Sequence, residues 1–208
     1  MIECGIEELN TFFTIRYRNK VGTAIMIYGE DASGKTTFVM RTVEKSNLPS
    51  VVIYTEGDPA ILLMKFDRIK NKLYTAKDFE AQGDLLDWLS PKPGSLLVID
   101  SISKLYAKAL AEGENPFYLN RELYRQLALI LSLTRRRNLL TMVVNQIRVG
   151  RGYDGLFIER PVGGVGTFKF FDVVLRFSRY RKRLTHITVE KGNIHLPRKT
   201  YFITGKNP

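Results

Sequence analysis

The segment GEDASGKT, residues 29–36, constrains the fold of this chain more than any other feature. It matches the pattern G-x-x-x-x-G-K-[ST] at every fixed position, after an apolar run at 23–28 and before a segment of helical character. In that context the glycines let the backbone curl so that amide N–H groups converge on phosphates, and the helix N-terminus adds partial positive charge. The sequence therefore predicts a strand, a phosphate-binding P-loop and a helix, the first unit of an α/β fold.

The residues of this loop have distinct expected roles. We expect Lys35 to reach the β- and γ-phosphates, the Thr36 hydroxyl to bind Mg²⁺, and Thr37 to contact the α-phosphate. The residues expected to surround the phosphates are Gly29, Glu30, Asp31, Ala32, Ser33, Gly34, Lys35, Thr36 and Thr37. The loop thus predicts binding of a nucleoside triphosphate, ATP with Mg²⁺.

The rest of the chain alternates apolar runs of strand length with helical segments. The predicted strands are residues 23–28, 51–55, 96–100, 139–145, 170–177, 184–190 and 200–204. The predicted helices are residues 34–45, 59–72, 78–89 and a long helix that begins at Asn115 and Pro116. This alternation predicts a mainly parallel sheet flanked by helices, and the last three strands predict an antiparallel extension. We expect a single domain over residues 1–208, with a loop from residue 147 to 166.

Three side chains follow strands whose carboxyl ends should border one crevice. Asp100 ends LLVID, where a Walker-B acid would hold Mg²⁺, although an aspartate at a strand end can be simply solvated. Glu56 follows VVIYT and could orient or deprotonate an attacking water; here too the alternative is a solvated carboxylate. Gln146 follows VVN, where a neutral amide could hydrogen-bond the γ-phosphate. From the residues alone, the roles of Glu56 and Gln146 stay open.

Together these motifs resemble the RecA/RadA recombinase superfamily, and more closely the short archaeal RadA paralogues of the RadB type. The resembling segments are IECGIEELN (2–10), YGEDASGKTT (28–37), YTEG (54–57), LLVIDS (96–101), VVNQI (143–147) and PVGG (161–164). Many families share the P-loop, whereas this order of motifs is much more specific. The resemblance implies a RecA-like P-loop NTPase core in which Lys35 contacts the phosphates, Glu56 is the hydrolytic residue and Gln146 senses the γ-phosphate. It also implies two DNA-facing loops, residues 107–115 and 147–163.

The function implied by this resemblance is that of an accessory protein in homologous recombination and DNA repair, with weak or DNA-dependent ATPase activity. Its expected partners are DNA, single-stranded in the first instance, and the main RadA-type recombinase or a junction nuclease. The sequence starts at the ATPase core, without the helix-hairpin-helix domain and polymerisation segment of full recombinases, so RadA-like filament assembly is not expected. A KaiC-like regulatory ATPase acting on a protein partner is the alternative.

The distribution of basic residues bears on the DNA hypothesis. The chain has 32 Lys and Arg against 21 Asp and Glu, a formal net charge of +11, which suits a polyanionic partner or simply a basic surface. In the second loop, arginines are interleaved with aromatic residues, a usual combination for single-stranded nucleic acid. These residues are Arg148, Arg151, Tyr153, Phe157 and Arg160. The alternative is a mobile loop with solvated charges. The segment RFSRYRKR, residues 176–183, could track a phosphate backbone or form a basic hairpin turn without a ligand.

Other classes of protein are disfavoured by composition. No apolar run approaches the roughly 18–20 residues that cross a bilayer, and the N-terminus lacks the pattern of a secretory signal. Cys4 is the only cysteine and there are two histidines, which excludes an internal disulfide and a Cys/His metal cluster. We therefore expect a cytoplasmic, nucleoid-associated protein.

Overall fold

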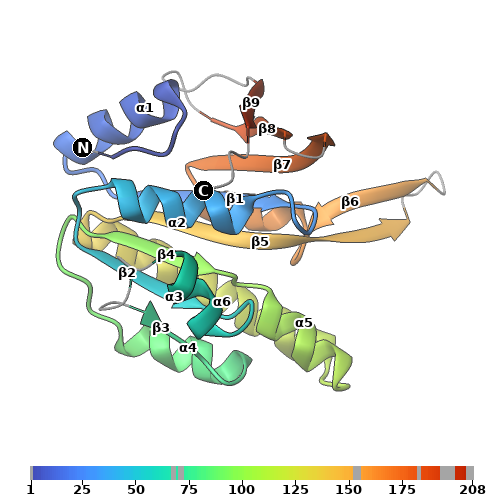
Figure 1. Ribbon diagram of the computed structural model, residues 1–208. Helices are drawn as coiled ribbons and strands as arrows, with labels where there is room; N and C mark the ends of the chain where they lie inside the picture. Colours follow the sequence, from blue (N-terminus) through green and yellow to red (C-terminus); the bar gives the residue numbers. More distant parts are fainter. Residues whose placement is uncertain are drawn as a thin grey trace.

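The computed structural model describes residues 2–66, 69, 73–151, 156–181, 184–192 and 200–204 (Figure 1). The helices are α1 Glu7–Arg18, α2 Lys35–Lys45, α3 Pro59–Lys65, α4 Phe79–Trp88, α5 Lys104–Ala111, α6 Pro116–Arg137 and the 3-10 helix η2 Val165–Phe170. The strands are β1 Thr23–Gly29, β2 Ser50–Tyr54, β3 Leu73–Tyr74, β4 Leu96–Asp100, β5 Leu140–Arg151, β6 Phe157–Pro161, β7 Val173–Arg181, β8 Leu184–Lys191 and β9 Thr200–Thr204.

The strands form one sheet in the order β3-β2-β4-β5-β1-β7-β8-β9, with β6 paired to β5. All pairs from β3 to β7 along this order are parallel, and β7, β8 and β9 are joined by antiparallel pairs. This confirms the predicted α/β fold with a mainly parallel sheet and an antiparallel C-terminal extension. Because β1, β2, β4 and β5 are parallel, their carboxyl ends meet at one edge of the sheet, where loops and binding sites gather.

Helices cover both faces of the sheet, because alternate residues of the central strands face opposite cores. Along β1, Ile25 and Ile27 belong to the core under α1, α2 and α3, whereas Met26 belongs to the core under α4, α5 and α6 (Figure 1). Leu119 and Leu123 of α6 are buried in that second core. None of the described helices is long and apolar enough to span a membrane.

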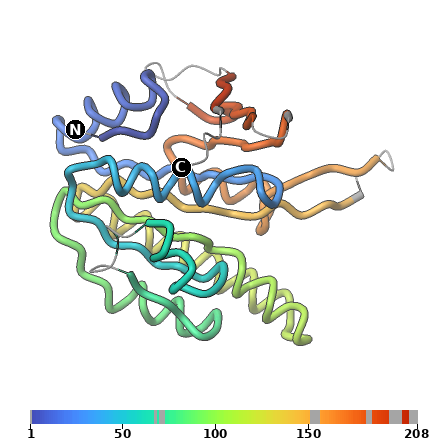
Figure 2. The backbone as a smooth tube through the Cα atoms, in the orientation of Figure 1, coloured from blue at the N-terminus to red at the C-terminus, as the bar shows by residue number. Residues whose placement is uncertain are grey.

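The predicted loop at residues 147–166 is wrong. Strand β5 continues to Arg151 and pairs antiparallel with β6, from Ile147 opposite Pro161 to Arg151 opposite Phe157. This β5–β6 ribbon projects from the body of the molecule (Figure 2). The glycine-rich composition suggested a loop, but Gly150 lies within the strand, and only Gly163 and Gly164, after β6, have a positive φ among the described glycines of this segment.

Four smaller expectations also needed correction. The helix predicted over 59–72 is α3, which ends at Lys65, and the first DNA-facing loop predicted over 107–115 is helical as far as Ala111. The strand predicted from residue 170 begins at Val173, because Phe170 closes η2. The basic segment 176–183 is not a turn: residues 176–181 continue β7, and the last two lie outside the described residues.

Candidate nucleotide-binding site

The P-loop connects the end of β1 to the start of α2. At two of its positions the backbone geometry favours glycine over any other residue. Gly29 ends β1 against the backbone of β7, where a Cβ atom would overlap the carbonyl oxygen of Phe177. Gly34 is the N-cap of α2 with φ of 94°, a left-handed conformation that side chains disfavour. Ala32, between them, also has a positive φ of 57°. The loop therefore curls back over the helix N-terminus, as a phosphate-binding loop requires.

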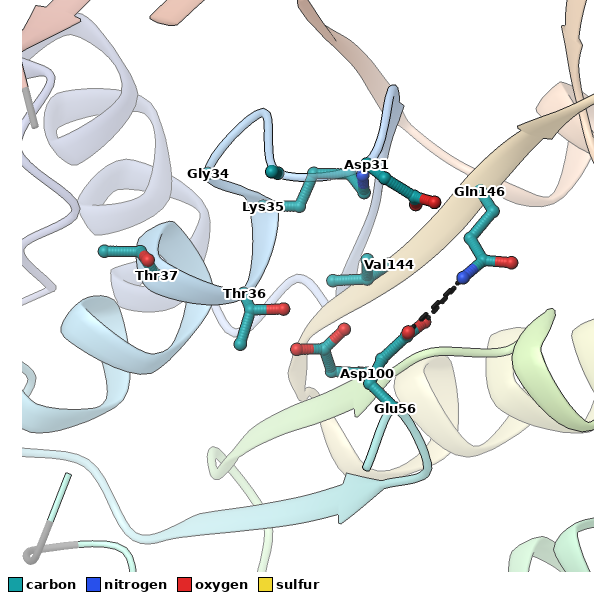
Figure 3. A pocket seen from close by; sticks show the side chains of 10 residues that line it. Asp31, Gly34, Lys35, Thr36, Thr37, Glu56, Asp100, Val144 and Gln146 are labelled. Carbon is teal, nitrogen blue, oxygen red and sulfur yellow. Dashed lines mark hydrogen bonds between the residues drawn. The ribbon is translucent and has the colours of Figure 1, made fainter. Parts of the chain in front are cut away.

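A cavity of about 350 Å³ opens at this loop, at the carboxyl edge of the sheet (Figure 3). Its lining residues are Asp31, Ala32, Gly34, Lys35, Thr36, Thr37, Glu56, Asp100, Val144 and Gln146. The structure thus brings together the predicted Mg²⁺ residues, the predicted hydrolytic residue and the predicted sensor. Val144 was not predicted, although it lies two residues before Gln146 on β5, and alternate residues of a strand share a face.

The Lys35 ammonium group is enclosed by the backbone of its own loop. Its Nζ donates to the carbonyl oxygens of Gly29 at 2.8 Å and Glu30 at 2.5 Å, and to the Ser33 hydroxyl at 3.5 Å. These three predicted phosphate-binding residues therefore hold Lys35 rather than line the cavity. Burial lowers the pKa of Lys35, and the nearby carboxylates, Asp31 first among them, oppose that shift.

Asp100 supplies a buried acid without a partner. Its side chain is 0% exposed, and neither carboxylate oxygen has a hydrogen-bond partner among the described residues. Burial raises the pKa of Asp100 to about 7; the Thr36 hydroxyl lies near enough to oppose the shift without reaching hydrogen-bond geometry. Unpartnered carboxylate oxygens beside a threonine hydroxyl are a donor set that fits Mg²⁺ and its waters.

The buried Asp100 carboxyl predicts a pH-dependent stability change. Its pKa in the folded protein, about 7, exceeds the ordinary 3.8, so ionised Asp100 destabilises the metal-free fold progressively as pH rises from about 4 to 7. Asp100→Asn keeps the shape without the charge, and above pH 7 it should raise the free energy of unfolding by at most about 4 kcal/mol (about three units at 1.36 kcal/mol each).

This prediction is checked by urea unfolding in EDTA at pH 4 and pH 8. The stabilisation should be present at pH 8 and nearly absent at pH 4. Asp84→Asn, which changes an exposed carboxylate on α4, is the matched control. An equal effect of Asp100→Asn at both pH values would contradict the prediction.

Glu56 and Gln146 contact each other directly. The Gln146 Nε2 donates to Glu56 Oε1 at 3.2 Å and to Oε2 at 3.3 Å (Figure 3). The Ser101 hydroxyl also donates to Glu56 Oε1. Glu56 is therefore not a freely solvated carboxylate. The Gln146 amide, which was expected to sense the γ-phosphate, is hydrogen-bonded to it instead.

Several curated proteins similar to this chain share one description, although no family model matches it. The "DNA repair and recombination protein RadB" of Methanothermobacter thermautotrophicus is 31% identical over 159 residues, covering 68% of this chain and 67% of that protein. This chain belongs to the RadB family. The RadB of Thermococcus kodakarensis is 33% identical over 140 residues, 61% and 62% of the two chains. That of Halobacterium salinarum is 26% identical over 188 residues, 82% and 78%.

A solved structure shows the same fold. The crystal structure of the RadB recombinase superposes with a TM-score of 0.70 at 23% identity, covering 98% of this chain and 96% of that one. The family thus accounts for the RecA-like core and for a role in DNA recombination and repair as a RadA paralogue. Membership of the RadB family also suggests an ATPase, with ATP as the expected ligand.

The β5–β6 ribbon of this RadB-family chain carries the residues predicted to contact DNA. Arg148 and Arg160 are exposed, lie directly opposite each other across the ribbon, and have no ion pair among the described residues. Like charges at opposite positions disfavour the pair unless an anion lies between them. The Phe157 side chain is 74% exposed at the far end of β6. The Arg151 side chain and Tyr153 lie outside the described residues.

The basic segment at residues 176–183 is less available for DNA contact than the sequence suggested, because its first arginine is paired with acidic residues. Arg176 of β7 is bound to Glu159 of β6 at 2.6 Å and lies 3.9 Å from Glu190 of β8. Those contacts tie the base of the ribbon to the sheet. They also pair Glu159, the acidic residue next to Arg160 on β6, with the positive charge of Arg176.

Proposed function

We propose that this chain is an ATP-dependent, DNA-binding accessory ATPase that serves recombination and repair beside a RadA-type recombinase or a junction nuclease. The observation that carries the proposal is the convergence of Lys35, Asp100, Glu56 and Gln146 on one cavity at the P-loop. No described residue of that cavity supplies a hydrogen bond to the Asp100 carboxylate. This supports a site completed by a ligand rather than a packing feature.

Each lining residue has a role in this proposal. Lys35 and the P-loop amides bind the triphosphate, and Thr36 and Asp100 would hold Mg²⁺, which supplies positive charge to the phosphate oxygens when bound. Glu56 orients a water and accepts its proton as the water oxygen bonds to the γ-phosphorus and the bond to the leaving β-phosphate oxygen breaks. Gln146 donates either to Glu56 or to the γ-phosphate, so its amide reports which state the site is in.

The DNA-binding half of the proposal is supported by the arginine pair of the ribbon. β5 carries Gln146, which lines the cavity, and Arg148 two residues further on. The same strand therefore links the nucleotide cavity to the surface that would contact phosphates. Single-stranded DNA suits an exposed ribbon on which Phe157 offers a face for base stacking.

The double substitution Arg148→Ala/Arg160→Ala tests the DNA-binding half. We expect affinity for a labelled single-stranded oligonucleotide, measured by fluorescence anisotropy with ATP and Mg²⁺, to fall by about tenfold. Two lost phosphate contacts should also make the slope of log K against log salt less steep by about 1.4.

The matched control is Arg18→Ala/Arg136→Ala, which removes two exposed arginines at the ends of α1 and α6, near the opposite edge of the sheet. The control should change affinity much less. Equal losses in the two double variants would remove the ribbon from the DNA site. Nucleotide-dependent self-association with no DNA bound by the wild type would instead favour a regulatory ATPase with a protein partner.

A further inference from the structure

The three residues after β4 contact both Glu56 and Gln146, whose side chains meet in the cavity. Ser101 and Ser103 are both fully buried, on either side of Ile102. The Ser101 hydroxyl donates to Glu56 Oε1, and the Ser103 hydroxyl accepts from the backbone N–H of Gln146 at 3.0 Å. One short segment therefore contacts both Glu56, which follows β2, and Gln146 of β5.

Ser101 is fixed in place by the end of β2. The Thr55 hydroxyl donates to the Ser101 carbonyl at 2.8 Å and accepts from the Ser101 N–H at 3.1 Å, and the Thr55 N–H donates to the Asp100 carbonyl at 2.8 Å. These bonds extend the β2–β4 pairing by one residue past the strands. Thr55 is the residue directly before Glu56, so the backbone of Glu56 and the hydroxyl of Ser101 are set relative to each other.

Ser101 is also fixed by α5. Its hydroxyl oxygen accepts from the Lys104 N–H at 3.2 Å, a bond of the kind that caps a helix, whereas Ser103 at the N-cap position makes no such bond. Accepting that bond orients the hydroxyl proton toward the remaining acceptor, Glu56 Oε1. The donor to Glu56 is thus set by a strand end and by a helix N-terminus.

The two donors to Glu56 differ in how easily they can leave. Gln146 has a long, half-buried side chain and can turn its amide to a phosphate. Ser101 has a single side-chain torsion and cannot move without breaking its bond to the Lys104 N–H. When Gln146 turns away, Ser101 still holds Oε1, and Oε2 is left free to receive a water.

We infer that Ser101 is a positioning residue for ATP hydrolysis, whose hydroxyl keeps the Glu56 carboxylate aimed at the attacking water after Gln146 has released it. The inference rests on the proposed function, because it presupposes that Glu56 acts on that water. It assigns to Ser101 a role in turnover that is separate from nucleotide binding. Because the first N–H of α5 donates to the same hydroxyl, displacement of α5 would also move Ser101 and so change the orientation of Glu56.

The test compares Ser101→Ala with Ser95→Ala in the full chain. Both serines are buried, and they flank β4 at its opposite ends. Ser101→Ala should lower kcat by about tenfold to a hundredfold, as expected for loss of orientation, with KM for ATP and the Kd of a fluorescent ATP analogue within about twofold of wild type. Ser95→Ala should leave kcat unchanged.

A double-mutant cycle with Glu56→Gln distinguishes positioning from a general structural effect. If Ser101 acts through Glu56, Ser101→Ala should cause no further loss of turnover in the Glu56→Gln background, whereas independent effects would multiply. Should Ser101→Ala not fold, Ser101→Cys, a weak donor, takes its place and should give an intermediate kcat.

The outcomes separate the inference from the function on which it rests. Absence of ATP turnover in the wild type, with and without DNA, overturns the proposed function. Wild-type turnover that Glu56→Gln abolishes but that the folded Ser101 variant retains overturns the role of Ser101 alone. A parallel rise in KM, or multiplicative losses in the cycle, likewise overturns it.

Discussion

Glu56→Gln should lower ATP turnover by about two to four orders of magnitude while leaving ATP affinity within a few fold of wild type. The substitution keeps the size of the side chain but removes its ability to accept a proton. One end of the new amide can still accept the Ser101 hydroxyl bond. The other end presents an NH₂ group toward the Gln146 Nε2, which now donates to both carboxylate oxygens. Two donors cannot bond to each other, so Gln146 loses one of its two bonds to residue 56, its amide is held less firmly, and nucleotide binding is not weakened.

The measurement is steady-state phosphate release together with equilibrium binding of a fluorescent ATP analogue. Glu80→Gln, which alters an exposed carboxylate in the first turn of α4, is the matched control and should keep wild-type turnover. Turnover in Glu56→Gln equal to that of the wild type would show that the proton acceptor lies elsewhere. Loss of ATP binding in this variant would instead make Glu56 part of the phosphate-binding site.

The parts of the fold that could be predicted from the sequence are those set by local pattern. The P-loop is identified by a motif of eight consecutive residues. Strands β1, β2 and β4 are continuous apolar runs of strand length, which favour a buried strand. The β5–β6 ribbon was missed because three glycines, at residues 150, 152 and 155, suggested a loop. Its strand pairing instead depends on cross-strand partners such as Val149 and Glu159, about ten residues apart.

The parts of the site that could not be predicted are contacts between strands distant in sequence. Glu56 and Gln146 are 90 positions apart, and Glu56 and Ser101 are 45 positions apart. Their positions at strand ends indicated that Glu56 and Gln146 could face the crevice. The hydrogen bonds among Glu56, Gln146 and Ser101 depend on the strand order β2-β4-β5, which no local sequence pattern encodes. Helix α5 was missed because it is only eight residues long and its buried residues, Leu105, Tyr106 and Ala109, give a short periodic signal.

Lys35→Ala should weaken ATP binding by about thirtyfold to several thousandfold, the loss of about 2–5 kcal/mol expected when one partner of a buried charge pair is removed. The side chain is 8% exposed and its ammonium group is held beside the cavity by the Gly29 and Glu30 carbonyls. That enclosure places the charge before the nucleotide arrives, so little rotamer entropy remains to be lost on binding. The measurement is isothermal titration calorimetry with ATP and Mg²⁺.

Two variants separate charge from geometry in the Lys35 result. Lys35→Arg keeps the charge, but a planar guanidinium is larger than the ammonium group and does not match the three acceptors around Nζ, so it should not restore affinity. Lys92→Ala removes an exposed lysine before β4 and should bind ATP as the wild type does.

Removing Lys35 also deletes a positive charge that lowers the pKa of Asp100, so the Asp100 carboxyl should hold its proton more tightly and Mg²⁺ should be retained less well. Wild-type affinity for ATP and Mg²⁺ in Lys35→Ala would contradict the whole assignment of the cavity, because no other described lining residue carries a positive charge.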